Sequence, residues 1–199
     1  MPGTLELIFD FASPNAYLAL KALPPVLART GASLQLQPAL LGGIFKATSN
    51  QAPMLAFAHV RGKLAYEALE MRRFVARHGL TRFAMNPHFP VNTLLLMRGY
   101  MAAGAAAQPA YVEAVMAAMW EDGRAMGDAA IVHTVLVEAG LDADDILGKA
   151  QQDDVKRALA AATEQAVGRG AFGIPTFFVG DEMFFGKERL DQVEAALSA

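Results

Sequence analysis

The stretch LELIFDFASP, residues 5–14, is the segment that most strongly indicates the fold. Apolar side chains alternate through residues 5–11, a pattern typical of a β-strand with one buried face. Ser13 and Pro14 follow, and serine is a favoured N-cap while proline is a favoured first helical residue. The segment therefore predicts a strand that leads directly into a helix beginning at Ser13.

The chain on the C-terminal side of this segment extends the pattern to β-α-β. We expect the helix to step at the prolines 24–25 and to end near Gly31, because proline interrupts a helix and glycine is favoured just after one. Residues 33–38 alternate again and predict a second strand. Two strands alone are not expected to be stable, so this unit needs a partner.

The last 30 residues supply that partner as a β-β-α unit. Residues 176–179 and 182–185 predict two strands, joined by a two-residue hairpin at Gly180 and Asp181. The helix that follows presents three apolar residues on one face, namely Leu190, Val193 and Leu197.

Between the two ends, residues 44–167 show apolar positions at helical spacing and no strand pattern. The predicted fold class is α/β: one mixed sheet built from both ends of the chain, with a large all-helical block inserted between them. The predicted domains are a discontinuous one formed by residues 1–42 and 163–199, and a helical one formed by residues 43–162.

Composition excludes several kinds of protein. The chain has 199 residues, a net charge of −3 and no cysteine, which excludes disulfides, thiol catalysis by its own residues and zinc–thiolate sites. The mild acidity argues against nucleic-acid binding. Residues 1–12 lack a secretory pattern, and no charge-free run is long enough to span a membrane. We expect a cytoplasmic protein that binds neither nucleic acid nor membrane.

Two further sequence features do not predict a binding site. GRGAFG, residues 168–173, matches a dinucleotide-binding pattern, but it follows a predicted helix and opens a strand, the reverse of the required context. A helix end that needs a positive φ angle explains these glycines better. The histidines show no metal-ligand spacing, so no metal is expected; they are His59, His78, His88 and His133.

Ser13 and the pair Ile174-Pro175 are the candidate site residues. Helix capping alone explains Ser13, but a helix N-terminus also attracts an anion, to which a hydroxyl can donate a hydrogen bond. Pro175 immediately precedes a predicted strand, in a position where a cis peptide bond could occur.

The whole chain resembles one known group of proteins through five segments. They are FDFASPNAYL (9–18), LGGIFKATSN (41–50), FPVNT (89–93), GAFGIPTFFV (170–179) and FFGKERL (184–190). In this order they resemble the 2-hydroxychromene-2-carboxylate isomerase family and its sister, the kappa-class glutathione transferases. Both are thioredoxin-like, in the subgroup that includes the DsbA disulfide oxidoreductases.

The resemblance implies a thioredoxin-like domain with a helical insertion, and glutathione as cofactor or cosubstrate. Ser13 matches the family's catalytic serine, Asn50 its glutathione-contacting asparagine, and Ile174 the residue before its cis-proline, whose backbone pairs with the cysteinyl part of glutathione. The γ-glutamyl end falls at Lys187 and Glu188, where the family usually has a small or amide residue followed by aspartate. The full set of implied glutathione-binding residues is Ser13, Pro14, Asn15, Asn50, Ile174, Pro175, Lys187 and Glu188.

The activity implied is a glutathione-dependent isomerisation, in which the thiolate adds reversibly to an unsaturated, aromatic-derived substrate. The family association is with aromatic compound catabolism, a small hydrophobic or aromatic substrate and a homodimer. Two alternatives stay open: a kappa-like glutathione transferase, and a non-catalytic thioredoxin-like protein that binds another ligand, which the unusual pair Lys187-Glu188 suggests. The lack of cysteine excludes a disulfide oxidoreductase that acts through its own thiols.

Overall fold

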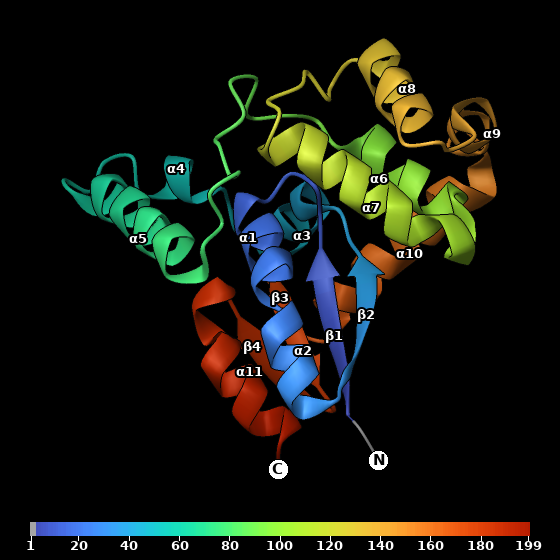
Figure 1. Ribbon diagram of the computed structural model, residues 1–199. Coiled ribbons are helices and arrows are strands. Elements are labelled where there is room, and N and C mark those ends of the chain that lie inside the picture. The colour runs from blue at the N-terminus through green and yellow to red at the C-terminus, as the bar shows by residue number, and fades with distance from the viewer. Residues whose placement is uncertain (1–2) are drawn as a thin grey trace.

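A mixed four-stranded sheet forms the centre of the molecule, as the computed structural model, which describes residues 3–199, shows (Figure 1). The strands are β1 (Thr4–Phe9), β2 (Ser33–Pro38), β3 (Thr176–Val179) and β4 (Glu182–Phe185), in the order β2-β1-β3-β4. β1 pairs in parallel with β2 and antiparallel with β3, and β3 pairs antiparallel with β4. The two ends of the chain therefore build one sheet, as the sequence predicts.

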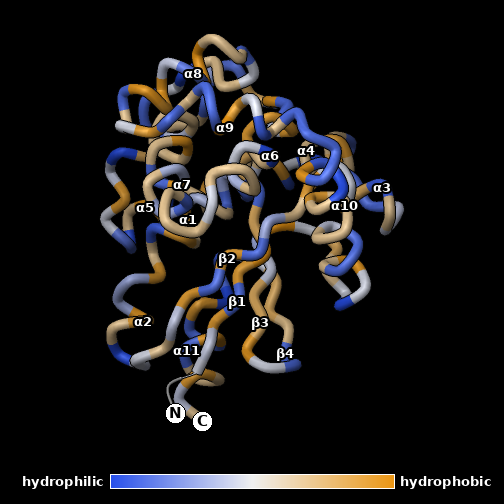
Figure 2. The backbone as a smooth tube through the Cα atoms, turned by 90° about the vertical axis from the view of Figure 1, so that its right-hand side faces the viewer, coloured by the Kyte–Doolittle hydropathy of each residue, from blue (hydrophilic) through white to orange (hydrophobic). Residues whose placement is uncertain are grey.

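The helices near the sheet follow the local signals of the sequence. α1 (Pro14–Ala22) begins after Ser13, α2 (Pro24–Thr30) follows after a step at Leu23, and Gly31 ends α2 with a φ angle of 68°. The remaining helices near the sheet are α3 (Leu41–Thr48), α10 (Asp153–Gly168), the short 3-10 helix η1 (Lys187–Arg189) and α11 (Leu190–Leu197). Figures 1 and 2 show α1, α2 and α11 on one face of the sheet and α3 and α10 on the other.

The inserted block consists of helices joined by non-helical segments, of which residues 79–93 and 121–128 are two, and it contains no strand among the residues that the structure describes. It contains α4 (Pro53–Ala56), α5 (Lys63–His78), α6 (Leu94–Ala102), α7 (Gly104–Trp120), α8 (Ala129–Glu138) and α9 (Ala143–Lys149). Helices α6 to α9 cover the end of the sheet at which β1 leads into Ser13 (Figure 1). The predicted domain boundaries fall within α3 and α10, and the division into two domains stays a prediction.

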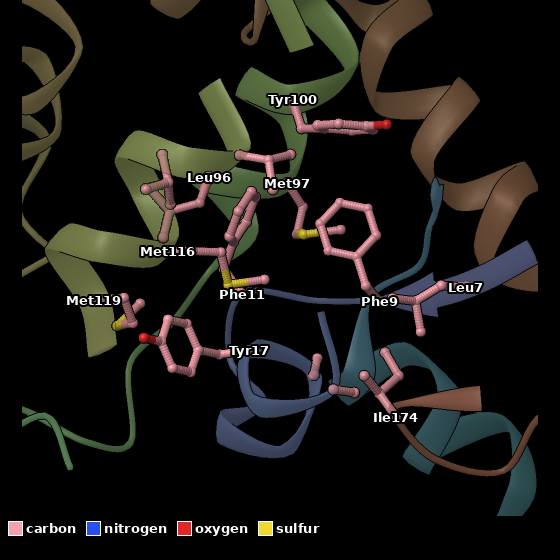
Figure 3. Close-up of a cluster of buried hydrophobic side chains, with 14 of the residues drawn as sticks. Leu7, Phe9, Phe11, Tyr17, Leu96, Met97, Tyr100, Met116, Met119 and Ile174 are labelled. Carbon is pink, nitrogen blue, oxygen red and sulfur yellow. The ribbon is translucent and has the colours of Figure 1, made fainter. Parts of the chain in front are cut away.

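One continuous core joins the sheet to the inserted block (Figure 3). The ring of Phe9 lies 5.1 Å from that of Tyr100 on α6 and 5.4 Å from that of Phe11, both in edge-to-face geometry. The Tyr111 hydroxyl donates a hydrogen bond to the Leu96 carbonyl and fills the space where a side chain at residue 99 would lie. Met97 of α6 and Met116 and Met119 of α7 are buried in this core.

Two details of the insertion concern the segment before α6. This helix begins at Leu94, since Thr93 has a non-helical conformation and donates its hydroxyl to Asp10. The Phe89-Pro90 peptide bond is cis, which the sequence analysis did not foresee. Within residues 3–199, no helix has the length and apolar character needed to cross a membrane.

Candidate functional site

Ser13 lies where β1 ends and α1 begins, and its side chain is fully engaged. The hydroxyl oxygen accepts a hydrogen bond from the Ala16 N–H at 3.2 Å, as an N-cap does, and the hydroxyl donates to the Ile174 carbonyl oxygen at 3.1 Å. The residue is only 4% exposed. Since the first turn of α1 contains no acidic residue, its partial positive charge is not neutralised by its own side chains.

Ile174 and Pro175 come to Ser13 from the other end of the chain. The peptide bond between them is cis, as the sequence analysis expected, and both residues are buried. Within residues 3–199, the Ile174 N–H donates no hydrogen bond, while its carbonyl accepts only from Ser13. The structure thus places beside the hydroxyl a residue whose backbone N–H has no partner among residues 3–199.

A buried carboxylate, which the sequence analysis did not single out, holds this loop. Asp10 accepts hydrogen bonds from the Ala12 N–H at 2.9 Å, the Leu41 N–H at 2.8 Å and the Thr93 hydroxyl at 2.6 Å. Its backbone carbonyl also accepts from the Ser13 N–H. Burial raises the pKa of Asp10 above its usual range, although these hydrogen bonds oppose the shift. The signal that could have identified it was an acid within an apolar strand segment.

Tyr17, one turn after Ser13, is a second polar residue that the sequence analysis did not assign to the site. Its hydroxyl donates to the Glu121 carboxylate at 2.9 Å, and its ring stacks on that of Phe83. Burial, together with the bond to Glu121, raises the pKa of Tyr17, so the phenol stays protonated. Because this hydroxyl donates to Glu121 at the end of α7, Tyr17 anchors α1 to the inserted block.

Lys187 and Glu188 lie at the start of η1 and form an ion pair with each other. The Lys187 ammonium contacts the Glu188 carboxylate and lies 5.4 Å from the centre of the Phe74 ring. The Lys187 side chain is 5% exposed, whereas that of Glu188 is 51% exposed. The positive charge at this position is therefore buried, and the acid beside it is already neutralised.

A cavity of about 150 Å³ opens beside this pair, between α5 and α11. Its walls are Glu70, Arg73, Phe74, Arg77, His78, Lys187, Glu188, Leu190 and Asp191. The Arg73 guanidinium lies 2.5 Å from Glu70 and its hydrogen bond lowers the pKa of that acid, while Arg77 lies 3.4 Å from Asp191. Each acid of the cavity thus has a basic partner, and Ser13 is not among the lining residues.

Asn50 and Asn15 approach the site in different ways. The Asn50 side chain donates to the Phe172 carbonyl at 2.8 Å, so it holds the loop that leads to Ile174, and it is exposed. The Oδ1 atom of Asn15 is buried in the first turn of α1 and accepts no hydrogen bond from residues 3–199. Such an orphaned acceptor is suited to a donor on a ligand.

The structure thus brings Ser13, Pro14, Asn15, Ile174 and Pro175 together, with Asn50 anchored to the same loop, and places Lys187 and Glu188 at a neighbouring cavity. Among residues 3–199 there is no group of three or more side chains able to hold a metal ion. A helix N-terminus facing a cis-proline at the start of an antiparallel strand, on a β2-β1-β3-β4 sheet, defines a thioredoxin-like protein.

Comparison with known proteins agrees with this class and refines it. The family described as DSBA-like thioredoxin domain matches residues 4–198. The chain belongs to this family and, within it, to the group of the 2-hydroxychromene-2-carboxylate isomerases and kappa-class glutathione transferases.

Three relatives show the extent of the similarity. The 2-hydroxychromene-2-carboxylate isomerase of Pseudomonas sp. (strain C18) is 30% identical over 97% of this chain and 89% of its own. Glutathione S-transferase kappa 1 of Rattus norvegicus is 27% identical over 96% of this chain and 88% of its own. A solved 2-hydroxychromene-2-carboxylate isomerase superposes with a TM-score of 0.82 at 28% identity, covering 98% of this chain and 94% of that one.

Proposed function

We propose that this protein is a glutathione-dependent isomerase of the 2-hydroxychromene-2-carboxylate isomerase type. The relatives named above support the reaction class. The observation that carries the proposal is the Ser13 hydroxyl, held at the α1 N-terminus and 3.1 Å from the Ile174 carbonyl, in a protein without cysteine. Such a site can stabilise a thiolate that a small molecule brings to it.

The residues of the site fit glutathione at the cysteinyl end. Ser13 would face the sulfur, and the free N–H and the carbonyl of Ile174 would pair with the cysteine backbone beside Pro14 and Pro175. The orphaned Oδ1 of Asn15 would accept a donor of the cofactor. Asn50 would contact the cofactor from the edge of the loop.

The γ-glutamyl end would lie at the cavity beside Lys187 and Glu188. The cavity offers both acids and bases, which suits an end that carries an ammonium and a carboxylate. However, the ion pair between Lys187 and Glu188 means that the carboxylate is not free to receive the ammonium. The fit is therefore weaker here than at Ser13.

When bound, glutathione would supply a thiolate able to add reversibly to an unsaturated carbon. Ser13 stabilises this thiolate by donating a hydrogen bond from its hydroxyl, and the N-terminus of α1 adds the partial positive charge of the helix dipole. A hydrogen bond to a charged group contributes about 1.5–3 kcal/mol and a helix terminus up to about 2 kcal/mol. Lowering a thiol pKa by about two units requires about 2.7 kcal/mol, which these two effects can supply.

The second substrate would be a small hydrophobic or aromatic molecule. Exposed apolar side chains of α4 and the turn after it, at Met54, Leu55 and Phe57, offer it a surface close in sequence to Asn50. The homodimer, the cytoplasmic location and a role in aromatic compound catabolism stay predictions.

Two other functions have a specific observation in their favour. A kappa-like glutathione transferase would use the same Ser13 site, and its relatives match this chain over 96% of its length. A non-catalytic thioredoxin-like protein that binds another ligand is favoured by the ion pair of Lys187 and Glu188.

Calorimetric titration with reduced glutathione tests the proposal. We expect a dissociation constant in the micromolar to low millimolar range and release of protons to buffer, across pH values from about 6 up to the ordinary thiol pKa of about 8.5. The control is S-methylglutathione, which has no thiol proton and should bind without proton release. Absence of glutathione binding, with another ligand bound at Ser13, would support the binding protein instead.

Replacing Lys187 with asparagine should strengthen glutathione binding about tenfold, since one charge-assisted hydrogen bond contributes about 1.5–3 kcal/mol. The reason is that Lys187→Asn frees the Glu188 carboxylate for the cofactor's ammonium. Calorimetry on Lys187→Asn and on the double variant with Glu188→Gln measures this, and the gain should vanish in the double variant. Weaker binding by the single variant would instead show that Lys187 itself holds a carboxylate of the cofactor.

A further inference from the structure

The Ser13 hydroxyl has no proton to offer a ligand in the arrangement that the structure shows. Its single proton goes to the Ile174 carbonyl oxygen, and its oxygen already accepts from the Ala16 N–H. A hydroxyl carries only one donor. Donation to a thiolate therefore requires that the bond between Ser13 and Ile174 be broken first.

Breaking that bond leaves the Ile174 carbonyl without a donor. Ile174 is 6% exposed and Ser13 is 4% exposed, so water has little access to replace the lost bond. Within residues 3–199 no other group donates to this carbonyl. A buried carbonyl left without a partner is costly, so the exchange is opposed unless the ligand supplies a donor of its own.

We propose that Ile174 and Ser13 together select thiols that carry an amide N–H next to the sulfur-bearing arm, as an N-acylated cysteine does. The ligand's N–H takes over the Ile174 carbonyl, and this releases the Ser13 hydroxyl to donate to the sulfur. Ile174 thus acts as a positioning residue: its carbonyl releases the catalytic hydroxyl only when the ligand's backbone N–H has bonded to it. A thiol without the N–H finds the hydroxyl still turned towards Ile174.

This inference rests on the proposed function, because it assumes that a bound thiolate is the reactive group. It adds a requirement that the proposed function does not contain: the thiol is activated only when its own amide has displaced Ser13. Simple alkyl thiols that enter the same place are then expected to stay protonated near their ordinary pKa of about 8.5.

The test compares glutathione with its ester analogue, in which an oxygen replaces the γ-glutamyl–cysteine N–H. Both have nearly the same shape, but the analogue has no donor for Ile174. The thiol pKa of each bound ligand is measured from the ultraviolet absorbance of the thiolate at saturating ligand. We expect the bound analogue to have a thiol pKa about one unit higher than bound glutathione, which is a tenfold weaker stabilisation of the thiolate.

Ser13→Ala is the matched protein variant. Without the hydroxyl there is nothing to release, so both ligands should show the same thiol pKa when bound to Ser13→Ala. Equal and lowered thiol pKa values for both ligands on the unmodified protein would overturn this inference while leaving the proposed function intact. If glutathione itself does not bind, the proposed function fails and the inference fails with it.

Discussion

Ser13→Ala should raise the thiol pKa of bound glutathione by about one to two units and lower turnover about 10- to 100-fold, because the lost charge-assisted hydrogen bond contributes about 1.5–3 kcal/mol. The hydroxyl is the one side-chain donor that the structure places beside the Ile174 carbonyl at the α1 N-terminus, among residues 3–199. The helix terminus remains in the variant, so part of the stabilisation should survive. Thiolate absorbance and steady-state kinetics on the same preparation measure both effects.

The control must separate this loss from the loss of a helix cap. Ser13 caps α1, and removing a cap costs about 1 kcal/mol of stability. Asp128 caps α8 in the same way, accepting from the Ala130 N–H at 2.8 Å, so Asp128→Ala loses an equivalent bond far along the chain from the site. Ser13→Ala should lose more stability than Asp128→Ala, because it also leaves the buried Ile174 carbonyl without its donor, but only Ser13→Ala should lose activity. An unchanged thiol pKa and full turnover in Ser13→Ala would contradict the assigned role.

The parts of the fold that the sequence predicts are those encoded by neighbouring residues. Alternation through residues 5–11 and the Ser13-Pro14 pair are local signals, and the strand and helix form where these signals place them. The hairpin at Gly180 is likewise local, and this glycine has a φ angle of 58°. A single sheet built from both ends of the chain follows because neither end could form a stable sheet alone, whereas the pairing of β1 with β3 is known only from the structure.

The electrostatics of the site could not be predicted in the same way. The sequence shows that Lys187 departs from the family pattern, but not that its ammonium is buried against the Phe74 ring and paired with its own neighbour. Phe74 lies on α5, more than a hundred positions away, and no spacing rule connects the two residues. The hydrogen bond from Ser13 to the Ile174 carbonyl is equally non-local, since 161 positions separate the two residues.

Asp10 is the clearest case of a residue whose role appears only in three dimensions. Its side chain accepts hydrogen bonds from the loop before Ser13 at Ala12, from the start of α3 at Leu41 and from the residue before α6 at Thr93. Asp10→Ala would leave three donors without an acceptor: the buried Thr93 hydroxyl and the part-buried N–H groups of Ala12 and Leu41. A buried donor left unpaired costs about 1–3 kcal/mol, so we expect a loss of about 3 kcal/mol in the free energy of unfolding, a large share of the roughly 5–15 kcal/mol typical of a domain.

Asp10→Asn adds a pH test with a definite sign. Burial raises the folded-state pKa of Asp10 above its value in the unfolded chain, so folding favours the protonated acid. Its contribution to stability is therefore complete below the unfolded pKa of about 3.9 and is lost as pH rises through the higher folded pKa. Asparagine cannot ionise, so it lacks this dependence.

The free energy of unfolding of the unmodified protein, minus that of Asp10→Asn, should therefore decrease as pH increases through this window and then level off. In Asp10→Asn the side-chain amide N–H₂ can face the Leu41 N–H, where the Asp10 carboxyl oxygen accepts a hydrogen bond. Two donors then face each other, which adds a pH-independent cost to the variant. This cost shifts the whole curve of the difference against pH without changing its slope. Urea unfolding at a series of pH values measures the difference. A difference that increases with pH would mean that the three donors outweigh burial and hold Asp10 ionised, so the carboxylate would then be a source of stability at neutral pH.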